Sequence, residues 1–350
     1  MAEVIALSGI DFTNPNFNAM WADAVLERYA TTWTELSEAL TGFGLDEWTV
    51  PADTRVNSEI SLLVPWGPEN TQNTGAAVVS GETATIFLGS NLRVDSSGAV
   101  ISGQVYYMAE LDVENPGLPS ETEYLNFIIR GLSFSAVGLY NAILTPDTAD
   151  DLRQMNIMFR GSDTFTLSDE ADRVSGYAGN DTISGGGDND TLQGGGGNDS
   201  LMGDAGNDLL QGGVGGDRLI GGMGRDTMQG STGNDRFIFT DAAETGATLG
   251  SADRILDFEQ GVDRIDLSAI DASSLDGGNN RFVFRGEVPE NEPGAEYMAV
   301  DGTLQFHAYD NAGTSNDYTL VYLYIDGDST ADAVIRLNGR FTLTAADFIL

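Results

Sequence analysis

The chain has 350 residues, 41% of them hydrophobic, which is enough for two or three domains with buried cores. It carries 54 acidic residues against 16 basic ones, a formal net charge of −38, and all 16 basic residues are arginine. This charge argues against binding to nucleic acid or to an anionic membrane, and the absence of cysteine excludes disulfides and thiolate metal sites.

The N-terminal sequence gives no targeting signal. Residues 1–17, MAEVIALSGIDFTNPNF, lack the basic flank and the apolar stretch of a cleaved signal peptide. No apolar run in the chain approaches the roughly 20 residues that a membrane-spanning helix needs. Taken alone, the N-terminus favours a cytosolic protein, an expectation that the C-terminus reverses.

Residues 1–157 predict an N-terminal α+β module whose role the sequence does not identify. An amphipathic pattern of aromatic and leucine side chains predicts a helix over residues 15–44. Two further stretches, 136–144 and 145–159, are also expected to be helical. Apolar alternation between turn sequences predicts strands over 59–67, 75–81, 83–94, 99–111 and 123–135.

A nine-residue pattern occupies residues 158–238. Its nine units begin at Met158, Leu167, Gly176, Gly185, Gly194, Gly203, Gly212, Gly221 and Gly230. The sixth place is always aspartate, namely Asp163, Asp172, Asp181, Asp190, Asp199, Asp208, Asp217, Asp226 and Asp235. The eighth place is always apolar, namely Phe165, Val174, Ile183, Leu192, Leu201, Leu210, Leu219, Met228 and Phe237. A disordered glycine-rich linker would not keep an apolar residue at a fixed phase, so the pattern predicts a folded repeat.

Each place in the unit has a physical role. Glycines at the first, second and fourth places allow positive φ, which lets the chain turn sharply and aim carbonyl oxygens inward. The aspartate adds a carboxylate, and together these oxygens suit calcium rather than a transition metal. The apolar eighth residue predicts a short strand with its side chain pointing inward. Two units should then form one turn of a parallel β-roll, with a loop on each side.

The repeat resembles the hemolysin-type, calcium-binding nonapeptide of repeats-in-toxin (RTX) proteins, GGxGxDxUx with U apolar. The resemblance implies that each ion lies between loops two units apart, so that nine units offer at most seven positions. We expect about four to six of them to hold Ca²⁺. The candidate ligand-loop residues that the resemblance implies, besides the nine aspartates, are Gly176, Gly179, Gly185, Gly186, Gly187, Gly194, Gly195, Gly197, Gly203, Gly206, Gly212, Gly213, Gly215, Gly221, Gly222 and Gly224.

The ends of the array depart from the pattern. The first two units, MFRGSDTFT and LSDEADRVS, keep the aspartate and the apolar residue but lose glycines, so we expect them to cap the entry of the roll. Near the other end, Gly216 and Arg225 stand where most units have asparagine. We expect Arg225 to weaken one calcium site.

Residues 239–350 resemble the C-terminal domain that follows the roll in serralysin-type metalloproteases. The resemblance rests on residues 252–272, ADRILDFEQGVDRIDLSAIDA, which match DxIxDFxxGxDxIDLS, and on the closing LTAADFIL. It implies a β-rich secretion domain. Within it, residues 318–324 and 333–338 predict strands flanking DGDSTAD. That loop either binds one more Ca²⁺ through Asp326, Asp328 and Asp332 or forms a plain acidic turn.

The ending AADFIL, an acidic residue before an apolar tail, resembles the uncleaved signal of type I secretion. We therefore expect the type I secretion machinery as a partner and an extracellular or cell-surface location. At low cytosolic calcium the acidic roll would stay unfolded, whereas extracellular calcium would neutralise its carboxylates and fold it. Affinities of roughly 10⁻⁴ to 10⁻³ M would suffice for this switch.

The sequence carries no recognisable catalytic motif. A serralysin-type protease needs HExxH, whereas this chain has one histidine, His307, which we expect on a strand surface rather than as a ligand. A GxSxG elbow, a P-loop and a dinucleotide fingerprint are also missing. We therefore expect residues 1–157 to act in surface attachment, a matrix or self-assembly, through a glycan or protein ligand. The alternative is a carboxylate-based hydrolase such as a glycosidase, with candidates that include Glu69, Glu82, Glu121 and Glu123.

Overall fold

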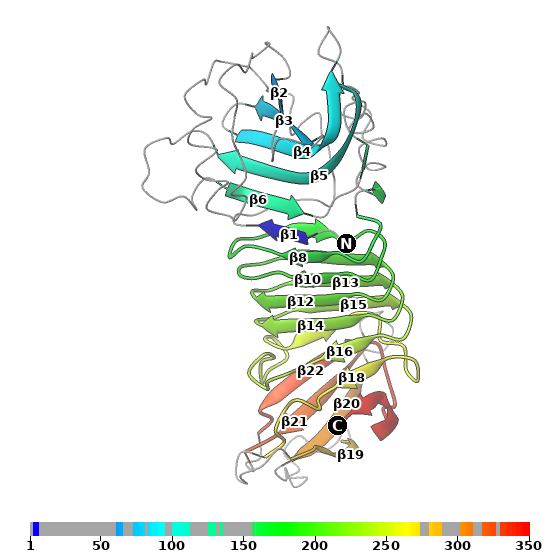
Figure 1. The fold of residues 1–350 in the computed structure, drawn as a ribbon. Coiled ribbons are helices and arrows are strands. Elements are labelled where there is room, and N and C mark those ends of the chain that lie inside the picture. The colour runs from blue at the N-terminus through cyan, green and yellow to red at the C-terminus, as the bar shows by residue number, and fades with distance from the viewer. Residues whose placement is uncertain are drawn as a thin grey trace. The chain divides into compact units, whose positions relative to one another are not determined.

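The computed structural model describes residues 3–6, 61–65, 73–80, 83–94, 100–112, 125–130, 134–135, 156–157, 159–273, 280–288, 302–310, 317–326 and 330–350. Contacts divide the chain into two compact units, Met1–Phe165 and Thr166–Leu350, and each is considered separately (Figure 1). In the described parts of the chain, no helix has the length and apolarity needed to cross a membrane.

The first unit contains an antiparallel sheet. Its strands lie in the order β2 (Ser61–Pro65), β3 (Asn73–Ser80), β4 (Thr83–Val94), β5 (Val100–Asp112), β6 (Leu125–Arg130) and β1 (Glu3–Ala6), and the short β7 (Phe134–Ser135) pairs with β5. Every predicted strand segment overlaps a strand, and β4 has the predicted bounds. Among the strands described in this unit, β1 was not predicted.

Several predictions for the first unit fall on residues that the structure does not describe. These are the helices over 15–44 and 136–144, and the carboxylates Glu69, Glu82, Glu121 and Glu123. Of the third predicted helix, Asn156 and Ile157 are described as helical.

The second unit contains the roll, whose strands follow one another at the predicted nine-residue interval (Figure 1). After β8 (Thr164–Thr166), they are β9 (Arg173–Ser175), β10 (Thr182–Ser184), β11 (Thr191–Gly196), β12 (Ser200–Ala205), β13 (Leu209–Val214), β14 (Arg218–Met223), β15 (Thr227–Thr232) and β16 (Arg236–Ile238). Even-numbered strands from β10 pair in parallel in one sheet, and odd-numbered strands from β9 in the other. Two units therefore make one turn, as predicted.

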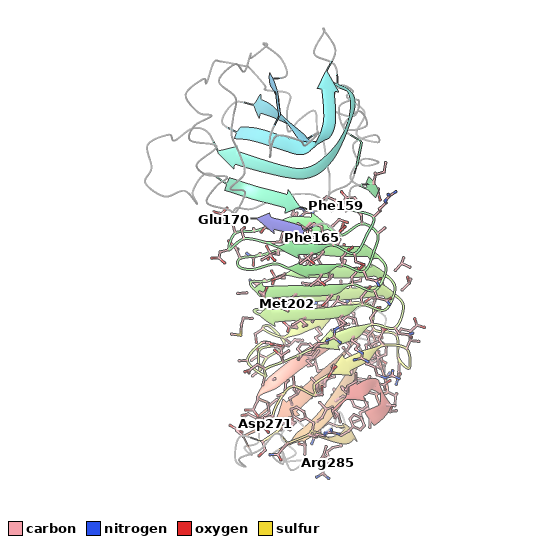
Figure 2. All side chains as sticks on the ribbon, viewed as in Figure 1. Phe159, Phe165, Glu170, Met202, Asp271 and Arg285 are labelled. Atoms are coloured by element: carbon pink, nitrogen blue, oxygen red, sulfur yellow. The ribbon has the colours of Figure 1, made fainter. Side chains whose placement is uncertain are left out.

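The eighth-place side chains form the core between the two sheets. All nine are at most 1% exposed. The strand register aligns the eighth-place residues of neighbouring strands, so that Leu192, Leu210 and Met228 lie next to one another across one sheet. Most residues at the next place are partly or fully exposed, as Met202 is at 37% (Figure 2), whereas Ile238 at the end of the array is 5% exposed. Burying each large apolar side chain contributes roughly 1.5–3 kcal/mol, so this column is a main source of stability.

Both sheets continue past residue 238. The strand β17 (Asp253–Ile255) pairs with β15, and β18 (Arg264–Asp266) pairs with β16. Further along the same sheets, β22 (Ala333–Asn338) pairs in parallel with β17, and β23 (Phe348–Ile349) with β18.

An antiparallel extension completes the C-terminal part. There β22 pairs with β21 (Tyr318–Tyr324), which pairs with β20 (Thr303–Tyr309), and β19 (Val283–Glu287) pairs with β20 in parallel. The strands β21 and β22 have the predicted bounds. His307 lies in a strand, β20, as predicted, but the predicted surface position was wrong: it is 7% exposed, and its Nδ1 lies 2.6 Å from the carbonyl oxygen of Val288.

The sequence that resembles a secretion signal is folded into the end of the roll. A 3₁₀-helix, η2 (Ala345–Asp347), precedes β23, and Asp347 is only 2% exposed. Its Oδ2 accepts hydrogen bonds from the backbone N–H and hydroxyl of Thr344 and from Gln260 Nε2. Phe348 is 6% exposed and lies in register with Ile265.

The core column gives a first prediction. Leu210→Ala should lower the free energy of unfolding of the calcium-loaded protein by about 2–5 kcal/mol, because it leaves a cavity between Leu192 and Met228. Val214→Ala, at a 65% exposed position of the same strand, should change it by less than about 0.5 kcal/mol. Urea unfolding followed by circular dichroism compares them, and equal effects would contradict the assigned core.

Candidate metal centre: the aspartate loops of the roll

The sixth-place aspartates form a ladder along each side of the roll. In each rung, the backbone N–H of one aspartate donates to Oδ1 of the aspartate 18 residues later, at 2.8–2.9 Å. One side joins Asp172, Asp190, Asp208 and Asp226, and the other joins Asp181, Asp199, Asp217 and Asp235. These side chains are at most 2% exposed, so half of each accepting carboxylate is committed to the neighbouring turn.

The other carboxylate oxygen, Oδ2, is buried without a hydrogen-bond donor at six ladder positions of the described structure. They are Asp190, Asp199, Asp208, Asp217, Asp226 and Asp253. A buried carboxylate oxygen without a donor is unfavourable unless a cation or a proton compensates it. The row of Oδ2 atoms is therefore a row of candidate cation positions.

Burial raises the pKa of these carboxyls above the ordinary value of 3.8. The pKa rises to about 7 at Asp190 and Asp208 and to about 6 at Asp217 and Asp226. The backbone N–H of the neighbouring rung lowers each value, but desolvation outweighs it. At neutral pH the folded chain therefore holds these groups in an environment that disfavours their charged form.

The first-place glycines serve a purpose that differs from the predicted one. They do not have positive φ. Instead, a Cβ at Gly185 would lie 2.3 Å from Asp190 Oδ2 and 2.7 Å from the carbonyl oxygen of Gly203. The same crowding against the unit's own Oδ2, at 2.3–2.4 Å, occurs at Gly176, Gly194, Gly203, Gly212, Gly221 and Gly230. Glycine is required here because the carboxylate occupies the space of a side chain.

Positive φ is confirmed at the second and fourth places. Glycines hold it at the second place (Gly186, Gly195, Gly213, Gly222) and at the fourth (Gly179, Gly197, Gly206, Gly215, Gly224). A Cβ at Gly197 would lie 1.6 Å from the carbonyl oxygen of Gly179, so successive loops pack backbone on backbone. Gly187, at a third place, donates its N–H to Ser168 O at 3.1 Å.

The donor set fits a hard cation. Each Oδ2 approaches the bare Cα of its own first glycine, and for Gly176 to Gly203 a carbonyl oxygen from the loop 18 residues later lies beside it. Within the described residues, no three acidic or histidine side chains form a metal cluster. An ion would therefore be held by carboxylate and carbonyl oxygens together, which is the ligand chemistry of Ca²⁺.

Near the start of the roll, a serine provides the hydrogen-bond donors that the Oδ2 atoms of later units lack. Asp163 is buried at 2% exposure. Asp172, in the next unit, uses Oδ2 to accept hydrogen bonds from Ser168 N and Ser168 Oγ, both at 2.9 Å. Since Ser168 stands where later units have positive-φ residues, the change in sequence provides the donor. The second of the two units predicted to cap the roll therefore differs from the later units at this oxygen.

Two ladder positions were missed because the period breaks before them. Asp226 N donates to Asp253 Oδ1 at 2.8 Å, and Asp235 N to Asp263 Oδ1 at 3.0 Å, across 27 and 28 residues. A strict period would have placed Glu244 in the ladder, but its carboxylate accepts from Thr240 instead. The signal was present as the repeated Asp-Arg-apolar triplets that start at Asp235, Asp253 and Asp263.

The fifth places form a second, exposed ladder that sequence reasoning also missed. The side-chain oxygens of Asn180, Asn189, Asn198 and Asn207 accept the fifth-place N–H of the loop 18 residues later, at 2.8–3.1 Å. The backbone N–H groups of Gly216 and Arg225 donate to Asn198 and Asn207, but neither residue has a side-chain oxygen that could accept from the next loop. The Arg225 guanidinium donates to Gly250 O at 3.3 Å.

The separate acidic loop is only partly described. Asp332 Oδ2 accepts the backbone N–H groups of Ile325 and Asp326, at 2.5 and 3.3 Å. That oxygen closes the turn. Asp328 lies outside the described residues.

Comparisons with known proteins identify the repeat. The family model "RTX calcium-binding nonapeptide repeat (4 copies)" matches residues 159–192, 166–201, 193–228 and 202–237. Among solved structures, the AlgE6R2 subunit of the Azotobacter vinelandii mannuronan C5-epimerase is similar at 23% identity and a TM-score of 0.30, over 49% of this chain and 88% of that one. The AlgE6R3 subunit is similar at 30% identity and a TM-score of 0.20, over 49% and 77%. No curated protein matches.

Paired glycine variants test the space around the carboxylate. Gly194→Ala should weaken calcium-dependent folding strongly, because its Cβ would lie 2.3 Å from Asp199 Oδ2 and 2.6 Å from Gly212 O. Gly196→Ala, whose Cβ would meet nothing closer than Tyr177 O at 3.9 Å, should be nearly neutral. The calcium midpoint of the circular dichroism change measures both. Similar midpoints for both variants would contradict this account of the first place.

Protonation should partly replace the cation. Because the pKa of Asp190 and of Asp208 is about 7 in the folded state and 3.8 ordinarily, the folded state binds more protons than the unfolded state between these values. Stability of the metal-free protein should therefore fall as pH rises from about 4 to about 7. Circular dichroism of chelator-treated protein measures this, with calcium-saturated protein as the control. Rising metal-free stability over this range would contradict it.

Proposed function

Because residues 159–237 are RTX calcium-binding nonapeptide repeats, we propose that this chain binds Ca²⁺ in the loops of its roll and folds in response. The observation that carries the proposal is the row of buried Oδ2 atoms without donors. Calcium takes six to eight oxygen ligands, including carboxylates and backbone carbonyls, and the loops offer both.

The residues of each loop have different roles in binding the ion. The Oδ1 hydrogen bond to the preceding turn fixes the orientation of the carboxylate, so that Oδ2 points to the first-place glycine. The bare Cα of that glycine leaves room for the ion. Positive φ at the fourth place brings the backbone of successive loops close together. Ca²⁺ itself would supply the positive charge that the Oδ2 row lacks.

Folding should depend on the ion because the unfolded chain has no such loops. The net charge of −38 opposes compaction, and folding desolvates a row of carboxylates that also repel one another. Ions that bind only the folded state add their binding free energy to its stability. The free energy of binding thus becomes free energy of folding.

We also propose that the chain leaves the cell by type I secretion and folds outside. Support comes from the resemblance of AADFIL to an uncleaved secretion signal, and from the availability of millimolar calcium outside cells. The signal would have to be recognised before the C-terminal part folds, because Asp347 and Phe348 are buried in the folded state.

For residues 1–157 we propose a binding role, in surface attachment or matrix assembly. The support is the absence from the sequence of the catalytic motifs sought above. This role requires that the folded protein retain a partner or assemble with itself.

Sedimentation velocity tests the calcium proposal directly. Chelator-treated protein should sediment slowly, and about 5 mM CaCl₂ should convert it to a compact form, whereas the same concentration of MgCl₂ should not, since Mg²⁺ demands stricter octahedral geometry. Large species that form after compaction would support assembly. An unchanged sedimentation coefficient in calcium would overturn the proposed switch.

A further inference from the structure

Two loops on one side of the roll carry extra acidic residues. The loop over 185–190, GGGDND, has Asp188 at the fourth place, and the loop over 203–208, GDAGND, has Asp204 at the second. The two loops are stacked, since Asp190 N donates to Asp208 Oδ1 at 2.8 Å. This step of the ladder therefore has four carboxylates, whereas the regular pattern provides two.

The backbone conformation of the two loops does not require aspartate at positions 188 and 204. Asp188 has φ 60° and Asp204 has φ 70°, a region in which glycine is easier to accommodate. Both follow the same backbone path as the regular glycines: the carbonyl oxygen of Asp188 faces Gly206, and that of Asp204 faces Gly222. The chain thus carries a carboxylate at two places where glycine would fit with less strain.

Asp204 lies beside the candidate ion position, and Asp188 precedes Asp190 by two residues in the same loop, exposed and with its Oδ1 accepting hydrogen bonds from the backbone N–H and Nδ2 of Asn189. Asp190 Oδ2 is buried without a donor, and Gly203 O lies beside it above the Cα of Gly185. Asp204 directly follows Gly203, and its Oδ2 accepts a hydrogen bond from Ser184 Oγ at 2.5 Å, next to Gly185.

The opposite side of the roll offers an internal comparison. There the loops over 194–199 and 212–217 have only glycine at the second and fourth places. Asp199 has the same buried Oδ2 without a donor and the same ladder bond, but these two loops carry no carboxylate besides Asp199 and Asp217. The step from Asp190 to Asp208 and the step from Asp199 to Asp217 therefore have the same ladder bond but four and two carboxylates, respectively.

We propose that the step between the loops over 185–190 and 203–208 is the tightest calcium site of the roll and fills first, with Asp188 and Asp204 as affinity-determining residues. They act by adding negative charge around an ion held by Asp190 and backbone carbonyls, and affinity for Ca²⁺ rises with the charge of its surroundings. The inference rests on the proposed calcium binding.

Early filling of this step has a consequence for folding. An ion held between these loops joins two neighbouring turns in the middle of the array. In a repeat protein each turn is stabilised by its neighbours, so an ordered pair of turns favours ordering of the next. Calcium-dependent folding would then start here and spread to sites of lower charge.

The test neutralises both charges without changing the backbone. In D188N/D204N, asparagine keeps the size of the side chain and tolerates positive φ as aspartate does. Isothermal titration with CaCl₂ should show the tightest binding step weakened by about tenfold, with the weaker steps unchanged. The calcium midpoint for folding, by circular dichroism, should rise in parallel.

A charge-matched control separates local from global electrostatics. D241N/D310N removes two exposed carboxylates from outside the roll loops, one of them paired with Arg340. It should leave the tightest step unchanged. An unchanged tightest step in D188N/D204N, or an equal loss in the control, would overturn the inference while leaving calcium binding intact. No calcium binding by the unaltered chain would overturn the proposed function as well.

Discussion

The structure of the roll depends on a carboxylate that is only half satisfied by the protein. One oxygen of each ladder aspartate takes the backbone N–H of the preceding turn, which sets the register of the turns. The other oxygen is buried and, at six described positions, has no donor. The same aspartate side chain therefore sets the register of the turns and creates the need for a cation, so a substitution of this residue would affect both.

The composition of the repeat follows from this arrangement. A buried carboxylate over the backbone excludes any side chain at the first place, and backbone packing between loops excludes one at most fourth places. The apolar eighth residue follows the aspartate by two positions, so its side chain points into the core between the sheets. Glycine, aspartate and the apolar residue are thus three parts of one geometric requirement, repeated at each half-turn.

Periodic features could be predicted from the sequence, and features that interrupt the period could not. The roll and its core were predicted because the sequence repeats every nine residues, and the strands β21 and β22 were predicted from local runs of apolar residues. Asp253 and Asp263 were missed because intervening residues displace them from the nine-residue phase. The asparagine ladder was missed although asparagine recurs at the fifth place, because a recurring exposed polar residue does not indicate its hydrogen-bond partner.

The ladder has a direction, and each end of it is closed by its own residues. At the start, Ser168 satisfies Asp172, and at the end the N–H of Asp253 is taken by Thr245 Oγ1 and that of Asp263 by Glu259 O. Each interior turn, by contrast, donates to the turn that follows it and accepts from the turn before it, so the interior turns are equivalent to one another. Such an array can gain or lose whole turns, eighteen residues at a time, while both closures stay intact. Length is thus the property of this fold that is freest to vary.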